Sequence, residues 1–136
     1  MWRLNKNPLH LILGIDLIAT GITLVSHHHY FFWPPHPEII TAILNDSVVG
    51  TLGIATGIGM IVWAIAKNKS LTANRWMITI ATAYYTLLSV TEFAHAFFAR
   101  AGEPHMYVSG IGELAMACLA LYMAKQSPSE EEGDGK

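Results

Sequence analysis

Charged side chains are scarce in this chain. Only 13% of its 136 residues are Asp, Glu, Lys or Arg, whereas soluble domains average about 25%. Hydrophobic residues make up 52% of the chain, and the formal net charge is −2. Nucleic-acid-binding proteins usually carry a strongly basic surface, which this composition does not supply. We therefore expect no nucleic-acid partner, and we expect the lipid bilayer to be the main environment of the protein.

Cysteine and the common catalytic motifs are also rare or absent. The one cysteine, Cys118, lies inside an apolar stretch, so no disulfide can form within the chain. Its side chain is expected to be buried as a small hydrophobic group. The sequence has no glycine-rich phosphate loop, no Ser or Cys nucleophile elbow and no paired zinc-binding cysteines. We therefore expect neither enzymatic activity nor a cofactor.

Long apolar stretches account for most of the sequence. Residues 47–66 contain no charged side chain, and their length suits an α-helix that crosses a hydrocarbon core about 30 Å thick. Backbone polar groups in lipid have to be hydrogen-bonded within the segment, which favours helices. The four expected spans cover residues 9–26, 47–66, 77–99 and 106–124. The sequence thus predicts an all-α membrane protein with one domain, residues 1–125, whose four transmembrane helices form an antiparallel up-down bundle.

The basic residues predict how this bundle is oriented. Of the eight Lys and Arg residues, only Arg100 lies in a connection on the expected outer side. The positive-inside rule therefore places both termini in the cytoplasm and the protein in the cell membrane. The other seven precede the first span, fill the loop between the second and third spans, or follow the fourth: Arg3, Lys6, Lys67, Lys69, Arg75, Lys125 and Lys136.

Two segments outside the spans carry recognisable signals. In the long outer connection, residues 27–46, Pro37 can open a short interfacial helix over residues 37–44. Residues 126–136 are polar and acidic, with glutamates at 130–132. This composition predicts a disordered cytoplasmic tail.

The second span carries three glycines on one helical face. Gly50, Gly53 and Gly57 are spaced three and four residues apart, and small residues at such spacing let helix backbones approach closely. Packing within one molecule explains the pattern. Self-association of the chain through this face is the alternative.

Three carboxyl side chains fall within the expected spans: Asp16, Glu92 and Glu113. A central carboxylate costs roughly 2.5–3.5 kcal/mol to insert, so we expect all three to face the interior of the bundle. Glu92 and Glu113 lie seven residues from the facing ends of two antiparallel spans, which gives them the same depth. We predict that they face each other in the outer half of the bundle and share a proton or a cationic partner. Asp16 is expected on the cytoplasmic side of the midplane.

Polar side chains accompany these carboxyl groups at helical spacing. The stripe in the first span continues through Thr20 and Thr23, and that in the third includes Tyr85 and Ser89. Such alignment predicts a polar seam inside the bundle with apolar residues facing lipid.

Glu92 and His95 also have the Glu-x-x-His spacing of diiron four-helix bundles. Glu113 is the one clear further ligand, so these three residues are weak candidates for a metal site and no metal is expected. The favoured interpretation is structural, with Glu92 and His95 hydrogen-bonded to each other and to hydroxyl groups. A proton or ion path is the alternative.

The general layout resembles that of phage holins, because the chain is very small, almost entirely membrane-embedded, and ends in a charged tail. This resemblance is architectural and implies a non-enzymatic membrane protein that self-associates, with a holin-like pore former as its sharpest form. A small transporter or a metal- or proton-handling protein that uses Glu92, His95 and Glu113 is the second hypothesis. An accessory subunit of a larger membrane complex is the third.

The orientation can be tested with cysteines introduced at His36 and at Asn68. Because these positions lie in expected outer and inner connections, an impermeant thiol reagent added to intact cells should label the first and spare the second. The reverse pattern, or equal labelling, would show that the orientation is wrong.

Overall fold

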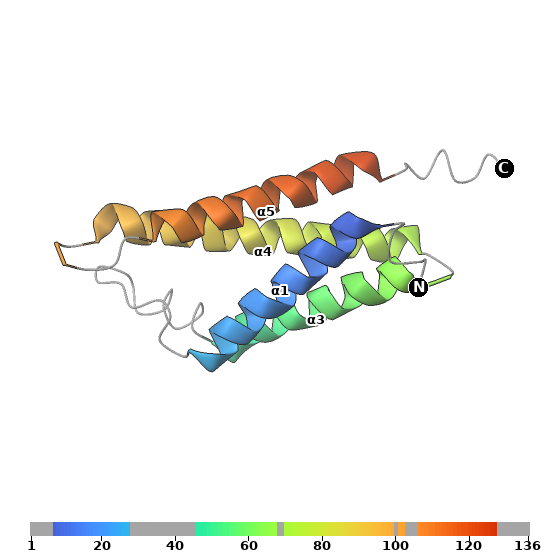
Figure 1. Cartoon of the computed structure of the whole chain (residues 1–136), viewed down its shortest axis with the longest axis horizontal. Helices are drawn as coiled ribbons and strands as arrows, with labels where there is room; N and C mark the ends of the chain where they lie inside the picture. The colour runs from blue at the N-terminus through green and yellow to red at the C-terminus, as the bar shows by residue number, and fades with distance from the viewer. Residues whose placement is uncertain (1–6, 28–45, 68–69, 100, 103–105, 128–136) are drawn as a thin grey trace.

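Four helices form the part of the chain that the structure, a computed structural model, describes: residues 7–27, 46–67, 70–99, 101–102 and 106–127. They are α1 (Pro8–Ser26), α3 (Ser47–Ile65), α4 (Leu71–Phe98) and α5 (Tyr107–Gln126), and Figure 1 shows their arrangement. The predicted all-helical class is confirmed. The interfacial helix predicted for residues 37–44 lies outside the described residues, as does the tail beyond residue 127. The first residue of that predicted tail, Gln126, is the last residue of α5.

The helix ends follow local sequence signals. α1 begins at Pro8, whose missing N–H costs nothing in the first turn. The Asp46 carboxylate caps α3 by accepting a hydrogen bond from Val48 N at 2.9 Å, and Ser70 Oγ caps α4 by accepting one from Ala73 N at 3.2 Å. Gly102, in the turn after α4, has φ +94°, a conformation that glycine adopts without steric cost.

Three helices are long and apolar enough to cross a membrane: α1, α3 and α5. α4 is the exception to the four predicted spans. It has 28 residues, or about 42 Å, and begins at Leu71, ahead of the predicted start at Met77. α4 is less apolar than the other three helices because it carries polar side chains, including Ser89, Glu92 and His95. These side chains are buried in the protein.

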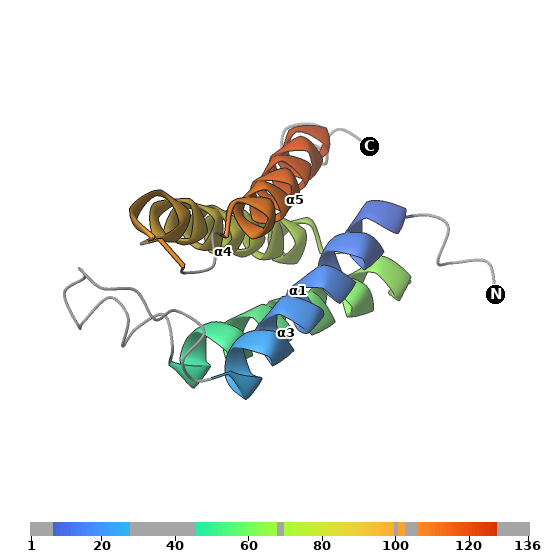
Figure 2. The same ribbon diagram turned by 60° about the vertical axis from the view of Figure 1, so that its left-hand side comes forward.

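The helices are arranged as two pairs. α1 packs along α3, and α4 packs along α5, with neighbours running in opposite directions (Figure 1). Figure 2 shows the two pairs as separate layers, which meet through contacts of α3 with α4 and of α1 with α5. At one end of the molecule α1 and α4 begin and α3 and α5 end. We call it the basic end, because Lys67, Arg75 and Lys125 lie there.

Glycines bring α1 and α3 into close contact. A methyl group at Gly57 would lie 2.5 Å from the carbonyl oxygen of Gly14, and one at Gly21 would lie 2.5 Å from the carbonyl oxygen of Gly50. The two residue numbers add up to the same total in each glycine contact, as expected for two antiparallel helices in one register. The predicted glycine face is therefore buried within the chain, against matching glycines of α1 that lie seven residues apart.

The third glycine of this face, Gly53, accommodates a side chain of the other helix pair. A Cβ atom at Gly53 would lie 2.6 Å from the hydroxyl oxygen of Tyr84, a residue of α4 that is only 4% exposed. All three glycines are thus covered by α1 or α4. Packing within one molecule accounts for the face.

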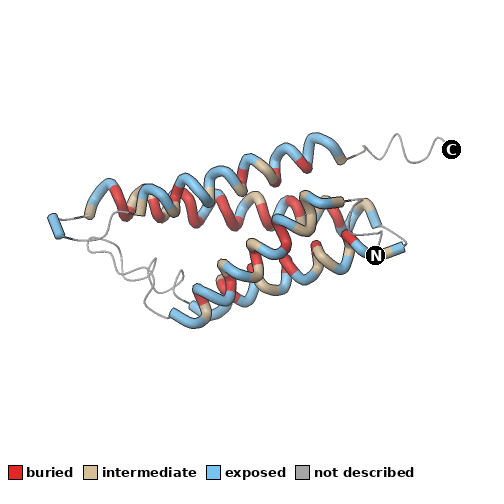
Figure 3. Tube along the Cα trace, viewed as in Figure 1, coloured by how far each residue is buried: buried red, intermediate tan, exposed pale blue. Residues whose placement is uncertain are grey.

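Burial is concentrated where the two pairs meet (Figure 3). Leu13, Leu17, Met60 and Ile78 lie in this core, each 2% exposed or less. Large apolar side chains cover the outside of all four helices, for example Ile15, Val62, Val90 and Val108. A water-soluble monomer rarely exposes so much apolar surface, whereas lipid accepts it.

Cys118 corrects an expectation. It is exposed on α5, not buried, because the inward face of this helix consists of Gly110, Ala117, Ala120 and Met123.

The glycine contact makes a specific prediction about stability. Gly57→Ala should lower the free energy of unfolding in detergent by about 1–3 kcal/mol, because the added methyl group meets backbone atoms that cannot move aside singly. Gly112→Ala is the matched control, since nothing lies within 4 Å of the position that its methyl group would occupy. Thermal unfolding followed by circular dichroism measures both, and equal stability of the two variants would show that the contact does not hold the pair together.

Candidate functional site

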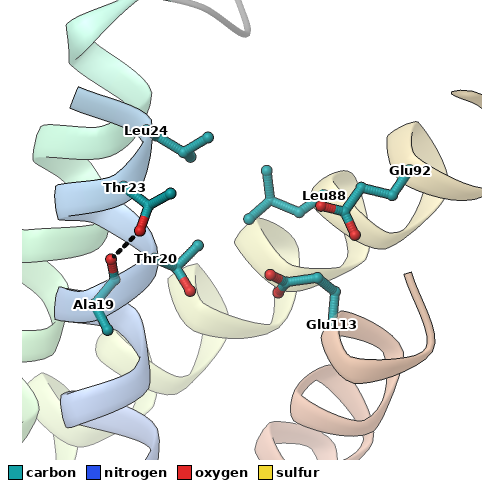
Figure 4. Close-up of a pocket in the computed structure, with 7 residues that line it drawn as sticks. All are labelled: Ala19, Thr20, Thr23, Leu24, Leu88, Glu92 and Glu113. Atoms are coloured by element: carbon teal, nitrogen blue, oxygen red, sulfur yellow. Dashed lines mark hydrogen bonds between the residues drawn. The ribbon is translucent and has the colours of Figure 1, made fainter. Parts of the chain in front are cut away.

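A cavity of about 230 Å³ lies between α1 and the α4/α5 pair. Three of its polar side chains are Thr20, Glu92 and Glu113, which come from α1, α4 and α5 respectively. Figure 4 shows both carboxyl groups directed into this space, with Thr20 across from them. Its other lining residues are Ala19, Thr23, Leu24 and Leu88. Because Ala19 and Thr23 are exposed, the cavity reaches the surface of the protein.

The two glutamates differ in their surroundings. Glu92 is 2% exposed, whereas Glu113 is half-buried. The Oε2 atom of Glu113 is nevertheless enclosed by protein and has no hydrogen-bond partner among the described residues. Glu113 also lies within electrostatic range of two other carboxyl groups, those of Glu92 and Asp16. The cavity thus contains an enclosed carboxyl oxygen beside like charges.

Asp16 is fixed by a tyrosine from the neighbouring pair. The hydroxyl of Tyr85, a fully buried residue of α4, donates to Asp16 Oδ2 at 2.7 Å. This bond joins α1 to α4. The sequence places Asp16 on the cytoplasmic side of the midplane, apart from the two glutamates. In the structure Asp16 does not line the cavity, although its charge is close enough to act on Glu113.

Two hydroxyl groups of the predicted stripes bond to backbone carbonyl groups. Ser89 Oγ donates to the carbonyl oxygen of Gly110 at 3.0 Å, which links α4 to α5. Thr23 Oγ1 donates to the carbonyl oxygen of Ala19 at 3.0 Å, within α1. Ser89 is therefore buried and holds two helices together, whereas Thr23 is exposed and bonds only within its own helix.

His95 lies one helical turn beyond Glu92 and is 1% exposed, but it does not line the cavity. Within the described ranges, no group of three or more His, Cys, Asp and Glu side chains is arranged to hold a metal ion. Of the predicted set, the structure therefore brings Glu92 and Glu113 to one cavity, and it gives no support to a metal bound by Glu92, His95 and Glu113.

A second polar cluster ties the helices together at the basic end. His10 Nε2 lies 2.7 Å from Asn74 Oδ1, and Asn74 Nδ2 donates to Ser127 Oγ at 2.9 Å. The His10 ring stacks on Trp63 with 4.5 Å between the ring centroids. These residues come from all four helices or their ends, and no motif in the sequence signals the cluster. A polar residue such as Asn74 is ordinary in the first turn of a helix, where it is usually exposed to solvent. In this structure Asn74 is only 3% exposed.

Comparison with protein-family models, with curated proteins and with solved structures finds no match to this chain. Its function therefore has to be argued from the geometry of the site.

The bond between the two pairs predicts the effect of removing one hydroxyl. Tyr85→Phe should lower the free energy of unfolding by about 1–3 kcal/mol, because it removes the described donor to the Asp16 carboxylate. Tyr122→Phe is the control. The Tyr122 side chain is exposed on α5, and within the described residues its hydroxyl accepts a hydrogen bond only from Gln126 of the same helix. Loss of this hydroxyl should change stability by less than about 0.5 kcal/mol. Thermal unfolding in one detergent compares the two variants, and equal melting temperatures would argue against a structural role for the Tyr85 bond.

Proposed function

We propose that this chain is a small multi-pass membrane protein that binds and releases protons at a carboxyl cluster formed by Glu92 and Glu113, and so carries protons across the membrane. In this proposal all four helices cross the bilayer as an antiparallel bundle. Both termini and the basic end face the cytoplasm, and the cavity lies in the outer half.

The observation that carries the proposal is the enclosed Oε2 atom of Glu113, in a cavity that this residue shares with Glu92. Carboxyl groups that only stabilise a fold are satisfied by donors, as Asp16 is by Tyr85. Several carboxyl groups close together in a poorly solvated site cannot all ionise cheaply. A cluster of this kind retains a proton, and a cavity of about 230 Å³ has room for water molecules that exchange it.

Ionisable groups inside a membrane protein typically mark ion or proton pathways. Here a dry layer separates the cluster from the basic end: Leu13, Met60 and Ile78 are each 2% exposed or less. The proton therefore reaches the cluster through the cavity, and passage toward the basic end requires the two helix pairs to move relative to each other. Their separate packing as α1/α3 and α4/α5 suits such a movement.

The exposed residues of α4 support its placement in the membrane. Leu87, Val90 and Phe97 are each 47% exposed or more, whereas Glu92 and His95 face the interior. A helix with this distribution can meet lipid on one side and the polar cluster on the other. α4 also runs antiparallel to α5, which is long and apolar enough to span.

A holin-like pore former is not favoured by any observation of the structure. That hypothesis drew on a glycine face able to repack between molecules, and this face is filled by α1 and α4. Self-association through another surface stays a prediction.

Proton flux into liposomes tests the proposal. Purified protein is reconstituted with an internal pH-sensitive dye, and a potassium gradient with valinomycin supplies the membrane potential. Wild-type protein should acidify the lumen faster than protein-free liposomes do. Glu113→Gln should reduce the rate to the protein-free value, because an amide fills the same space but does not titrate.

Thr91→Val is the matched control. Thr91 lies on α4 next to Glu92 in sequence, but it does not line the cavity and its hydroxyl bonds to the carbonyl oxygen of Leu87 in the same helix. This variant should retain the wild-type flux. Equal flux in wild type and Glu113→Gln, or no flux above the protein-free rate in wild type, would contradict the proposal.

A further inference from the structure

The basic end combines positive charge with a lack of negative charge. Lys67, Arg75 and Lys125 all lie there, and no Asp or Glu occurs among the described residues of that end. The described carboxyl groups are those of the cavity cluster, of Asp16, which bonds to Tyr85, and of Asp46 at the start of α3 at the opposite end. An anionic partner of this end would therefore meet an attractive field with no nearby described carboxylate opposing it.

A cavity of about 400 Å³ lies at this end, between the first turns of α4 and the last turn of α5. Arg75 and Thr79 line it from α4, and Ser127 lines it just beyond α5. Ser127 Oγ accepts a hydrogen bond from Asn74, which leaves its own O–H to act as a donor. A guanidinium and two hydroxyl groups around one space are suited to bind a phosphate group.

The rest of the cavity wall is apolar. Ile78 lines it from α4 and Ala124 lines it from α5. The neighbouring Trp76 is 66% exposed, and tryptophan at a helix end commonly marks the headgroup level of a bilayer. The cavity therefore combines groups suited to a phosphate, close to headgroup depth, with apolar residues in the same wall.

We infer that the Arg75 cavity, defined by Arg75, Ile78, Thr79, Ala124 and Ser127, binds the headgroup of an anionic phospholipid from the cytoplasmic leaflet. The phosphate lies against Arg75 and the hydroxyl groups, and the start of an acyl chain lies against the exposed Ala124. Basic pockets between transmembrane helices on the cytoplasmic side bind such headgroups in other membrane proteins. This inference does not depend on proton transport, but it shares the placement of the basic end at the cytoplasmic surface.

The acidic segment that follows Ser127 is a competing occupant. Its glutamates at 130–132 carry the charge that Arg75 would attract. The phospholipid is favoured because the same wall carries apolar residues, which a run of glutamates does not match.

Native mass spectrometry of the full chain tests the inference. Protein is equilibrated in detergent micelles with equal amounts of phosphatidylglycerol and phosphatidylcholine, and the ratio of the two lipids that remain bound is measured. Wild-type protein should retain more phosphatidylglycerol. Arg75→Gln should lower the ratio about 5-fold, as expected for the loss of about 1 kcal/mol from one basic side chain at the membrane surface.

Two variants control for charge and folding. Lys125→Gln removes an equal charge from the same end, but Lys125 is exposed and does not line the cavity, so the ratio should stay near the wild-type value. Arg75→Lys keeps the charge and should retain most of the preference, with helical content by circular dichroism confirming the fold of each variant.

Three results would overturn the inference. The first is an unchanged ratio in Arg75→Gln, and the second is an equal loss in Lys125→Gln. The third is a preference that appears only when Glu130, Glu131 and Glu132 are all changed to Gln, which would assign the cavity to the acidic segment. Added inorganic phosphate should leave the bound lipid in place; its displacement would instead indicate a site for free phosphate.

Discussion

The close contact between α1 and α3 determines how α1 is rotated in the molecule. Gly14 and Gly21 allow the backbone of α3 to approach one face of α1. At 3.6 residues per turn, Thr23 lies about half a turn around the helix from this face. The polar stripe of α1 is therefore directed away from α3 and toward α4 and α5, where Tyr85 bonds to Asp16. Without the glycine contact, nothing between α1 and α3 would select this rotation of α1, because their apolar side chains could pack together in several rotations of the helix.

The lack of water in the bilayer then determines how the two helix pairs meet. A polar group that faced lipid would lose its hydrogen bonds to water without replacement. Hydrogen bonds between helices avoid this cost at two places in the molecule. Tyr85 and Ser89 form them near the cavity, and His10 and Asn74 form one at the basic end. Within the described part of the chain, Tyr84 and Glu113 depart from this pattern, because the Tyr84 hydroxyl oxygen and the Glu113 Oε2 atom are buried without a hydrogen-bond partner. Of these two residues only Glu113 lines the cavity, which is the reason for assigning it a functional role.

Much of this arrangement is visible in the sequence. The apolar stretches predict the helices, and the spacing of Glu92 and Glu113 from the turn between them brings both to one cavity. The glycine spacing of α3 predicts a face for close packing, but it does not identify the partner helix. The partner is identified only when the separation of Gly14 and Gly21 is compared with that of Gly50 and Gly57. Both separations are seven residues, so each pair of glycines lies on one face of its helix.

Other features depend on three-dimensional packing. The hydrogen bond between Tyr85 and Asp16 follows from how the two pairs cross, which no local pattern encodes. The cluster of His10, Trp63 and Asn74 joins residues far apart in the chain, each of which is ordinary in its own helix. Cys118 is exposed because α5 buries its smaller residues, so an apolar stretch alone does not say which side faces inward.

The central claim is that the polar faces of the two pairs meet and that Glu92 and Glu113 act as one unit. A double-mutant cycle with Glu92→Leu, Glu113→Leu and the double variant tests it most directly, with thermal unfolding in detergent as the measurement. Each single change should destabilise the protein by leaving the other carboxyl group in an apolar site. The double variant should then lose less than the sum of the two, with a coupling energy of about 0.5–3 kcal/mol. Additive losses would contradict the account, because they would show that the two carboxyl groups do not share one site.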